Sequence, residues 1–145
     1  MFVSPISGRG PLAQAMATAA SGMQAQATRL RVVSENIANS QSTSTVPGGD
    51  AYRRKTITFD QAIDRVTGAS VVRPARIGTD PSAQPLRFDP SHPAADAQGY
   101  VRMPNVSSVI EMADLREASR TYEANLSAMA QARTMLTRTV EILRG

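Results

Sequence analysis

The chain consists of two stretches without proline, separated by a middle region that is rich in it. Residues 12–46 and 105–145 contain no proline, and their only glycines are Gly22 and Gly145. Seven of the nine prolines fall between Pro47 and Pro104, and proline is poorly tolerated inside a helix. This distribution predicts a helix near each end of the chain and an irregular region between them.

Apolar residues recur in alternating steps of four and three along both outer stretches. The N-terminal series is Leu12, Met16, Ala19, Met23, Leu30, Val33 and Ile37, with Gln26 as its polar exception. The C-terminal series is Met112, Leu115, Tyr122, Leu126, Met129, Leu136, Val140 and Leu143, interrupted by Ser119 and Arg133. This rhythm is typical of coiled coils. Ser108 and Glu111 have the spacing of a capping box, so we expect the second helix to run from about 107 to about 143.

The middle region favours short strands. It opens with the turn-prone residues 47–50 and continues with β-favouring pieces at 52–59, 70–77, 86–88 and 100–103. Nearby prolines restrict such strands to edges and hairpins, which do not form a core alone. We therefore predict a mainly α chain, with an N-terminal helix in 1–40, a β-rich loop or flap in 41–105, and a C-terminal helix in 106–145 that pairs with the first as a coiled coil.

The first predicted helix has an unusual surface. Residues 10–28 carry no charge, whereas an amphipathic surface helix turns a charged stripe to water. Small residues also lie outside its apolar series, so we expect burial on a second side by another chain. The second helix has internal pairs of opposite charge, such as Glu117 with Arg120. A soluble hairpin within one molecule is the alternative. Because the first helix has few large apolar residues, we expect it to fold on assembly.

The amino-acid composition argues against most kinds of catalytic and metal-binding site. The chain has no cysteine and one histidine, His92, so we predict no catalytic residue, no metal site and no cofactor. A hydrolytic site of His92 with Asp89 or Asp96 and a serine is disfavoured because no glycine-rich elbow is present. No window of 18 consecutive apolar residues could span a bilayer, and no stretch has the apolar region of a secretory signal.

The charge balance leaves one alternative open. The formal net charge is +4 and the isoelectric point is near 10.3, but the only dense basic cluster is Arg53-Arg54-Lys55 and few aromatic residues are available to stack on bases. A solvated surface is the favoured interpretation. A basic coiled-coil protein that binds nucleic acid is the alternative.

Several motifs resemble those of flagellar rod and hook proteins. Residues 34–40, following Leu30, are similar to an N-terminal signature that ends in "N-[IL]-A-N". Residues 92–106 resemble the "P-x-A-D-A-x-G-Y-V-x-x-P-N-V" stretch of short proximal rod subunits, and 65 middle residues leave no room for the large outer domains of distal subunits. The residues that carry the resemblance are Asn36, Ala38, Asn39, Asp96, Gly99, Tyr100, Pro104, Asn105, Glu111, Met112, Arg120, Tyr122, Asn125 and Met135, together with 52–55.

The resemblance implies a non-enzymatic building block of the bacterial flagellar basal body. Family members polymerise through their terminal helices, which form an inner coiled coil (a D0-type domain) around an export channel within the periplasmic rod, the drive shaft. The implied partners are copies of the chain and other axial proteins (FlgB, FlgF, FlgG and a FliE-type adaptor), with no nucleic acid and no membrane insertion. Export through the flagellar type III apparatus without a cleaved signal is also implied.

Five residues admit specific structural interpretations. Asn36 and Asn39 near a helix end can bind free carbonyls or adopt left-handed geometry, or they can form an ordinary polar terminus. Asn125 in mid-helix suggests a hydrogen bond across a subunit boundary, with a solvent-facing side chain as the alternative. Gly99 is expected to form a turn before a strand that Pro104 ends. Residues 1–10 depart from the family pattern.

Overall fold

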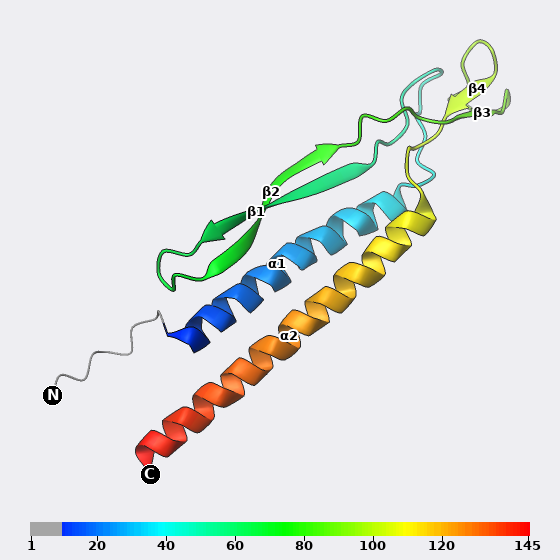
Figure 1. Cartoon of the computed structure of the whole chain (residues 1–145). Coiled ribbons are helices and arrows are strands. Elements are labelled where there is room, and N and C mark those ends of the chain that lie inside the picture. Colours follow the sequence, from blue (N-terminus) through cyan, green and yellow to red (C-terminus); the bar gives the residue numbers. More distant parts are fainter. Residues whose placement is uncertain (1–9) are drawn as a thin grey trace. The chain divides into compact units, whose positions relative to one another are not determined.

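The computed structural model describes residues 10–145; the expected N-terminal extension lies almost wholly outside the described residues. The elements are α1 (Pro11–Ala38), β1 (Lys55–Ile63), β2 (Ser70–Thr79), β3 (Leu86–Phe88), β4 (Tyr100–Arg102) and α2 (Ser108–Arg144) (Figure 1). The expected mainly α chain with a β region between two helices is confirmed. With 37 residues, α2 is about 55 Å long.

The chain divides into two compact units. Unit 1 contains α1 as far as Arg29, the segment Thr58–Ala75, and α2 from Glu117 onward. Unit 2 consists of two segments. Leu30–Ile57 includes the end of α1, and Arg76–Arg116 includes the start of α2. Each unit therefore combines pieces of the N-terminal helix, the middle region and the C-terminal helix.

In unit 1, the hairpin of β1 and β2 lies along α1 (Figure 1). The Thr18 hydroxyl donates to the Ser70 carbonyl at 3.0 Å, and the Val72 amide donates to the Ser21 hydroxyl at 3.2 Å. The Gln14 amide donates to the Thr67 carbonyl at 3.1 Å. Polar side chains of α1 thus bind backbone groups of the hairpin, which would otherwise be left unpaired along a strand edge. The hairpin therefore covers part of the second side of α1, whereas Ala20 and Ala27 are exposed, so cover by another chain stays a prediction.

The two helices run antiparallel in unit 1 (Figure 1) and approach closely at Gly22. A Cβ atom at Gly22 would lie 2.7 Å from the side-chain nitrogen of Asn125, so only glycine fits there without a shift of Asn125. Glycine costs a helix interior about 1 kcal/mol relative to alanine, and the close approach accounts for its presence. Asn125 is half-buried against α1 of its own chain, so the solvent-facing interpretation is wrong.

The face that α2 turns toward the interior differs from the predicted seam. Ala118 and Ala132 are buried, although neither was predicted. Leu115, Tyr122 and Met129 of the predicted series are half-buried. The other members are exposed, and they are Met112, Leu126, Leu136, Val140 and Leu143. Because these five residues are exposed in the single chain, pairing of the whole series with α1 as a coiled coil is not confirmed and stays a prediction.

Along α1 the predicted series agrees better with burial. Ala19 and Val33 are buried, and the remaining members, Leu12, Met16, Met23, Leu30 and Ile37, are half-buried. Ala25 and Val32 are also buried although the seam did not include them. The side-chain oxygen of Gln26, the polar exception, is buried without a hydrogen-bond partner among the described residues.

In unit 2, β3 and β4 form an antiparallel pair with Phe88 opposite Tyr100. The two rings meet edge to face with their centroids 5.2 Å apart. Gly99 has a φ of +86°, and a Cβ atom there would lie 3.0 Å from the Phe88 ring. The expected turn at Gly99 is confirmed, as is the end of β4 just before Pro104.

Candidate functional site

A set of polar side chains meets inside unit 2, where the end of α1, the start of β1 and the first turn of α2 come together. We call this set the polar junction; it comprises Asn36, Tyr52, Arg54, Lys55, Asp80, Asn105 and Glu111. Asn36 and Glu111 are the two polar or charged residues that are fully buried among the described residues. Buried polar groups are costly unless each is paired, so the pairing decides what the junction does.

Asn36 forms a complete set of hydrogen bonds. Its side-chain nitrogen donates to the Lys55 carbonyl at 2.9 Å and to the Glu111 carboxylate at 3.1 Å. Its side-chain oxygen accepts from the Tyr52 hydroxyl at 2.9 Å and from the Lys55 amide at 2.8 Å. Two donors and two acceptor positions are what an asparagine side chain offers. Asn36 therefore fixes the backbone at the start of β1 to the last turns of α1.

The hydrogen bonds of the Asn36 side chain all go to groups outside α1, so the expectation that it caps the helix is wrong. Asn39 does cap, because its side-chain nitrogen donates to the Glu35 carbonyl at 2.9 Å. The prediction of left-handed backbone geometry is wrong for Asn36 and for Asn39, since no residue other than glycine has a positive φ in the described part of the chain.

Glu111 is the buried charge of the junction. One carboxylate oxygen accepts from the Arg54 side chain at 2.5 Å, and the other accepts from Asn36. The capping-box interpretation of Ser108 and Glu111 is therefore wrong: the carboxylate binds groups outside α2, and the Glu111 amide donates to the Ser107 carbonyl at 3.0 Å. A buried charge that keeps both an ion pair and a hydrogen bond fixes geometry, because removing either partner leaves the other uncompensated.

The basic cluster at 53–55 is largely engaged within unit 2. Arg54 lies 3.9 Å from the Asp80 carboxylate in addition to its contact with Glu111, and Lys55 forms a 3.0 Å ion pair with Glu35. The backbone of Arg54 is also fixed, since its amide donates to the Asn105 side chain at 2.8 Å. Two of the three basic side chains therefore serve internal pairing, which weakens the nucleic-acid interpretation of this cluster.

The Asp80 side of the junction is organised by a turn. The amide and hydroxyl of Ser82 hold the pKa of Asp80 below its usual value, with a smaller contribution from Arg54. The Asn105 side chain donates to the Asp80 carbonyl at 3.2 Å and to the Ser82 hydroxyl at 2.9 Å. Asn105 thereby links the segment before α2 to the start of β1 and to this turn.

Burial raises the pKa of Tyr52, and its hydroxyl donates to Asn36. A raised pKa keeps the phenol protonated in the folded state while the unfolded chain begins to ionise near its ordinary value of about 10. Stability is therefore complete below that pH and falls as the pH rises toward the folded-state pKa. We expect Tyr52→Phe to cost about 1 kcal/mol at neutral pH and to remove part of the alkaline loss.

Urea unfolding midpoints of both proteins between about pH 8 and about pH 11 would measure this effect. Tyr100 and Tyr122 remain in the variant and provide an internal control for general alkaline unfolding. An equal fall of the midpoint in both proteins would contradict the prediction.

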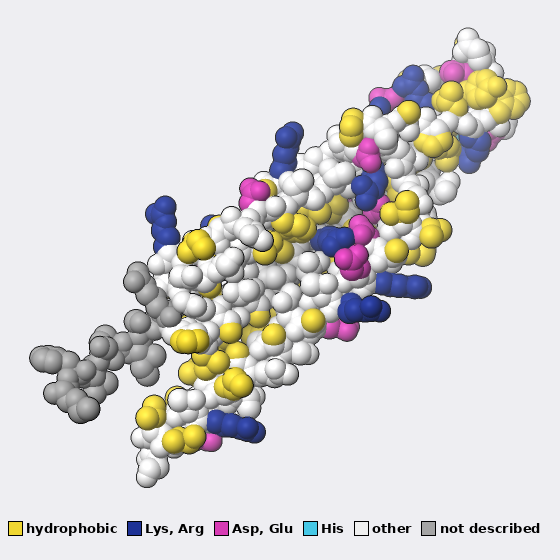
Figure 2. All heavy atoms as spheres, viewed as in Figure 1, with side chains coloured by type: hydrophobic (Ala, Val, Ile, Leu, Met, Phe, Trp, Pro, Cys, Tyr) yellow, Lys and Arg dark blue, Asp and Glu magenta, His cyan; other side chains and the backbone are white. Residues whose placement is uncertain are grey.

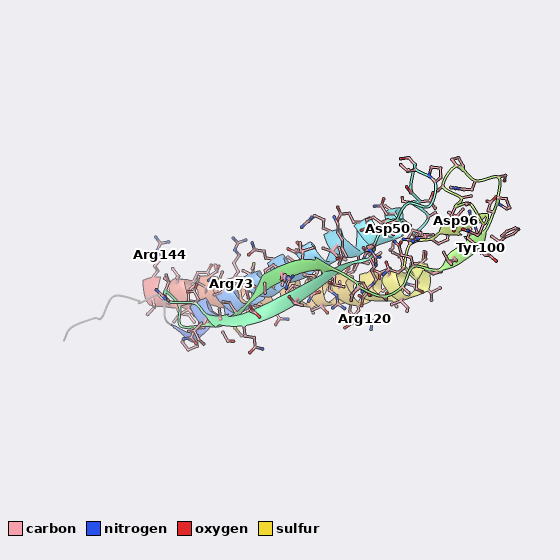
Figure 3. All side chains as sticks on the ribbon, turned by 90° about the horizontal axis from the view of Figure 1, so that it is seen from above. Asp50, Arg73, Asp96, Tyr100, Arg120 and Arg144 are labelled. Carbon is pink, nitrogen blue, oxygen red and sulfur yellow. The ribbon has the colours of Figure 1, made fainter. Side chains whose placement is uncertain are left out.

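The residues considered for hydrolysis have local structural roles. His92 accepts from the Ala94 amide at 3.0 Å through its ring nitrogen, and Asp89 accepts from the Ser91 hydroxyl at 2.8 Å. Asp96 accepts from the Tyr100 amide at 2.9 Å in the turn before β4 (Figure 3). In the described part of the chain, no three histidine or acidic side chains gather closely enough to hold a metal ion. No helix among residues 10–145 is both long and apolar enough for a bilayer crossing.

Sequence reasoning identified Asn36, Asn105 and the 52–55 segment, and the structure brings these together. Tyr122 and Asn125 lie instead in unit 1, and Arg120 is exposed on α2 (Figure 3). The roles of Asp80 and of the buried Glu111 carboxylate were missed. The one signal for Glu111 was a charged residue immediately before the apolar Met112 at the start of a regular heptad series.

Large apolar residues on the surface are a second unusual feature of the chain. Apart from Pro104, the buried apolar side chains among residues 10–145 are all alanine or valine, for example Ala25, Val32 and Val101. Nine large apolar residues of α2 are exposed, and they are Val109, Ile110, Met112, Leu126, Met135, Leu136, Val140, Ile142 and Leu143. Hydrophobic side chains gather on the C-terminal end of α2 (Figure 2). Such surfaces are typical of chains that bind other proteins.

Comparisons with known proteins match both ends of the chain. The family described as "Flagella basal body rod protein" matches residues 16–44, and the family described as "Flagellar basal body rod FlgEFG protein C-terminal" matches residues 97–142. These ranges include Asn36, Asn105 and Glu111 of the polar junction.

Full-length relatives share much of the sequence. The flagellar basal-body rod protein FlgC of Agrobacterium fabrum is 48% identical over 93% of this chain and 97% of its own length. The FlgC proteins of Yersinia enterocolitica and Borreliella burgdorferi are 40% and 39% identical, over 86% and 88% of this chain and 92% and 94% of their own lengths. The chain therefore belongs to the family of flagellar basal-body rod proteins FlgC.

Proposed function

We propose that this chain is a structural subunit of the bacterial flagellar basal-body rod and that it polymerises through its terminal helices. The observation that carries the proposal is the reversed distribution of apolar side chains: alanine and valine are inside, and large aliphatic residues of α2 are outside. Contiguous exposed apolar patches are uncommon on monomeric proteins and mark sites that contact other proteins. Membership of the FlgC family supports the same role.

The terminal helices supply the subunit interfaces in this proposal. On α2 the interface residues are the exposed members of the heptad series, and on α1 they are the half-buried members of its series. Each chain pairs its own two helices in a D0-type coiled coil, and neighbouring chains cover the apolar surface that remains. Unit 1 supports this by its close helix approach at Gly22. Folding of the N-terminal helix during assembly remains part of the proposal.

The subunit is placed in the periplasmic part of the basal body, around the export channel. The proposed partners are copies of the chain, the axial proteins FlgB, FlgF and FlgG, and a FliE-type adaptor. Delivery by the flagellar type III apparatus without a cleaved signal is also part of this proposal. A rod subunit transmits torque and needs no catalytic residue, which agrees with the structural nature of the family.

Nucleic-acid binding is not supported. The comparisons identify rod proteins, and the internal ion pairs of Arg54 and Lys55 occupy two of the basic side chains on which that alternative depended.

The test replaces the cell's own protein by this chain or by a variant, followed by purification of basal bodies. We expect the unchanged chain in the rod and normal swimming. Val140→Asp places a charge within the exposed apolar surface of α2 and should abolish both incorporation and swimming. Thr137→Asp adds the same charge three residues away on a polar position of the same helix, and it should incorporate normally.

Circular dichroism of the two purified variants shows whether each still folds. Absence of the unchanged chain from basal bodies would overturn the proposed function. Normal incorporation of Val140→Asp would overturn the interface on α2.

A further inference from the structure

The helix pair of unit 1 contains a buried polar group without a partner. The side-chain oxygen of Gln26 is shielded from solvent, and no donor among residues 10–145 forms a hydrogen bond with it. A buried acceptor that lacks a donor costs more than a typical hydrogen bond contributes, and most buried polar atoms in proteins are paired. The position of Gln26 in the structure therefore needs a physical reason.

Gln26 lies on the face of α1 that meets α2. In unit 1 the two helices run side by side (Figure 1), with Gly22 against Asn125 and the Arg29 side chain 4.0 Å from the Glu117 carboxylate. Gln26 follows Gly22 by four residues and precedes Arg29 by three, so the three residues share one face of α1. The amide group of Gln26 is therefore held between the two helices.

The surrounding interface offers little to offset the cost of this amide. The stretch of α2 between Glu117 and Asn125 lies opposite Gln26, and its one buried residue is Ala118. An alanine side chain has no donor, and the backbone amides inside a helix already bond to carbonyls four residues earlier. On α1 the neighbouring buried residue is Ala19. Alanine contacts bury little apolar area, so they stabilise the pair less than the leucine contacts of a coiled-coil seam would.

Asn36, which lies further along α1, shows the opposite arrangement. All four hydrogen-bonding positions of its side chain are used inside unit 2, and both oxygens of the Glu111 carboxylate are paired. Opening the polar junction would break these bonds. Opening the helix pair of unit 1 would instead let water bind the Gln26 oxygen and would remove the cost of its burial. The free energy of local opening should therefore be lower in unit 1 than in unit 2.

We propose that Gln26 is a built-in weak point, which lets α1 and α2 separate in unit 1 of the free chain while the polar junction stays closed. Resting on the proposed function, this gives Gln26 a regulatory role. A rod subunit has to make its terminal helices available to neighbouring chains during assembly. A helix pair that contains an uncompensated buried amide opens at lower cost than an apolar pair of the same size.

Hydrogen exchange of the purified whole chain measures this opening, because the amides of a helix exchange when the helix opens. Gln26→Met removes the buried oxygen with little change in side-chain length or helix propensity. We expect the protection of amides in 12–29 and 117–132 to rise about tenfold, with no change in unit 2. Gln24→Met makes the same substitution at an exposed position of α1 and should leave the protection of both units unchanged.

The outcomes separate this inference from the proposed function. Unchanged or reduced protection of unit 1 in Gln26→Met would overturn the weak point, and so would an equal rise in Gln24→Met. An equal rise in both units of Gln26→Met would also overturn it, because the two units would then open together. All three results would leave the rod function standing, since that function is decided by the presence of the unchanged chain in purified basal bodies. Absence of the unchanged chain there, with a tenfold rise in Gln26→Met, would overturn the rod function and support the weak point.

Discussion

Replacing Glu111 by alanine is expected to lower the free energy of unfolding of the isolated chain by about 3–5 kcal/mol. The Glu111 side chain is fully buried, and its removal leaves Arg54 with only its 3.9 Å contact to Asp80 and leaves one amide proton of Asn36 without a partner. A cost of this size approaches the whole stability of a small domain, so unit 2 should unfold near room temperature. Urea unfolding followed by far-ultraviolet circular dichroism would measure it.

Two further variants show whether the cost comes from the buried position. Glu117→Ala removes the same type of side chain from the same helix, where it is 68% exposed and 4.0 Å from Arg29. That ion pair should be worth less than about 1 kcal/mol. Glu111→Gln keeps an acceptor for Asn36 and should fall between the two alanine variants. Equal, small losses for Glu111→Ala and Glu117→Ala would contradict the role given to the polar junction.

The helices and strands were predictable because each depends on neighbours in the sequence. Proline placement separated the outer stretches from the middle, and the observed α2, which begins at Ser108 and ends at Arg144, differs by a residue from the expected limits. The strand pieces at 86–88 and 100–103 also agree closely with β3 and β4. Local periodicity and chain breakers carry this information.

The polar junction was not predictable by the same means because its partners are distant in the sequence. Asn36 and Glu111 are 75 residues apart, and a local reading assigned both to helix ends. The spacing from Ser108 to Glu111 satisfied a capping-box pattern, but the carboxylate of Glu111 gains more from a buried pair with Arg54 than from its own helix terminus. Tertiary contacts overrode the local preference.

The faces of α2 show a related limit. A seven-residue series selects residues for a supercoiled pair, yet the structure buries alanines at 118 and 132 that such a series passes over. The antiparallel alignment that brings Gly22 against Asn125 is likewise not revealed by any periodicity. Apolar residues at 136, 140 and 143 therefore looked like an intramolecular seam and are exposed instead.

The second large effect is expected from Asn36→Asp, a substitution that preserves the shape of the side chain. The nitrogen of Asn36 faces the Lys55 carbonyl and the Glu111 carboxylate, both of which only accept hydrogen bonds. An ionised carboxylate in that place would bring a second negative charge to about 3 Å from Glu111. We expect a loss of at least about 3 kcal/mol, because a second buried negative charge is added beside Glu111 and two acceptors lose their donor.

Asn39→Asp is the matched control for this variant. Asn39 caps the same helix, is half-buried, and donates to the Glu35 carbonyl, so its replacement loses one hydrogen bond and places a negative charge near the helix C-terminus. Together these effects should cost about 1–2 kcal/mol. Urea unfolding of both variants would compare them directly. If Asn39→Asp proved as damaging as Asn36→Asp, the helix end rather than the junction would be what holds unit 2 together. If Asn36→Asp alone unfolded the chain, then the Asn of the rod signature acts by joining α1 to β1 and α2.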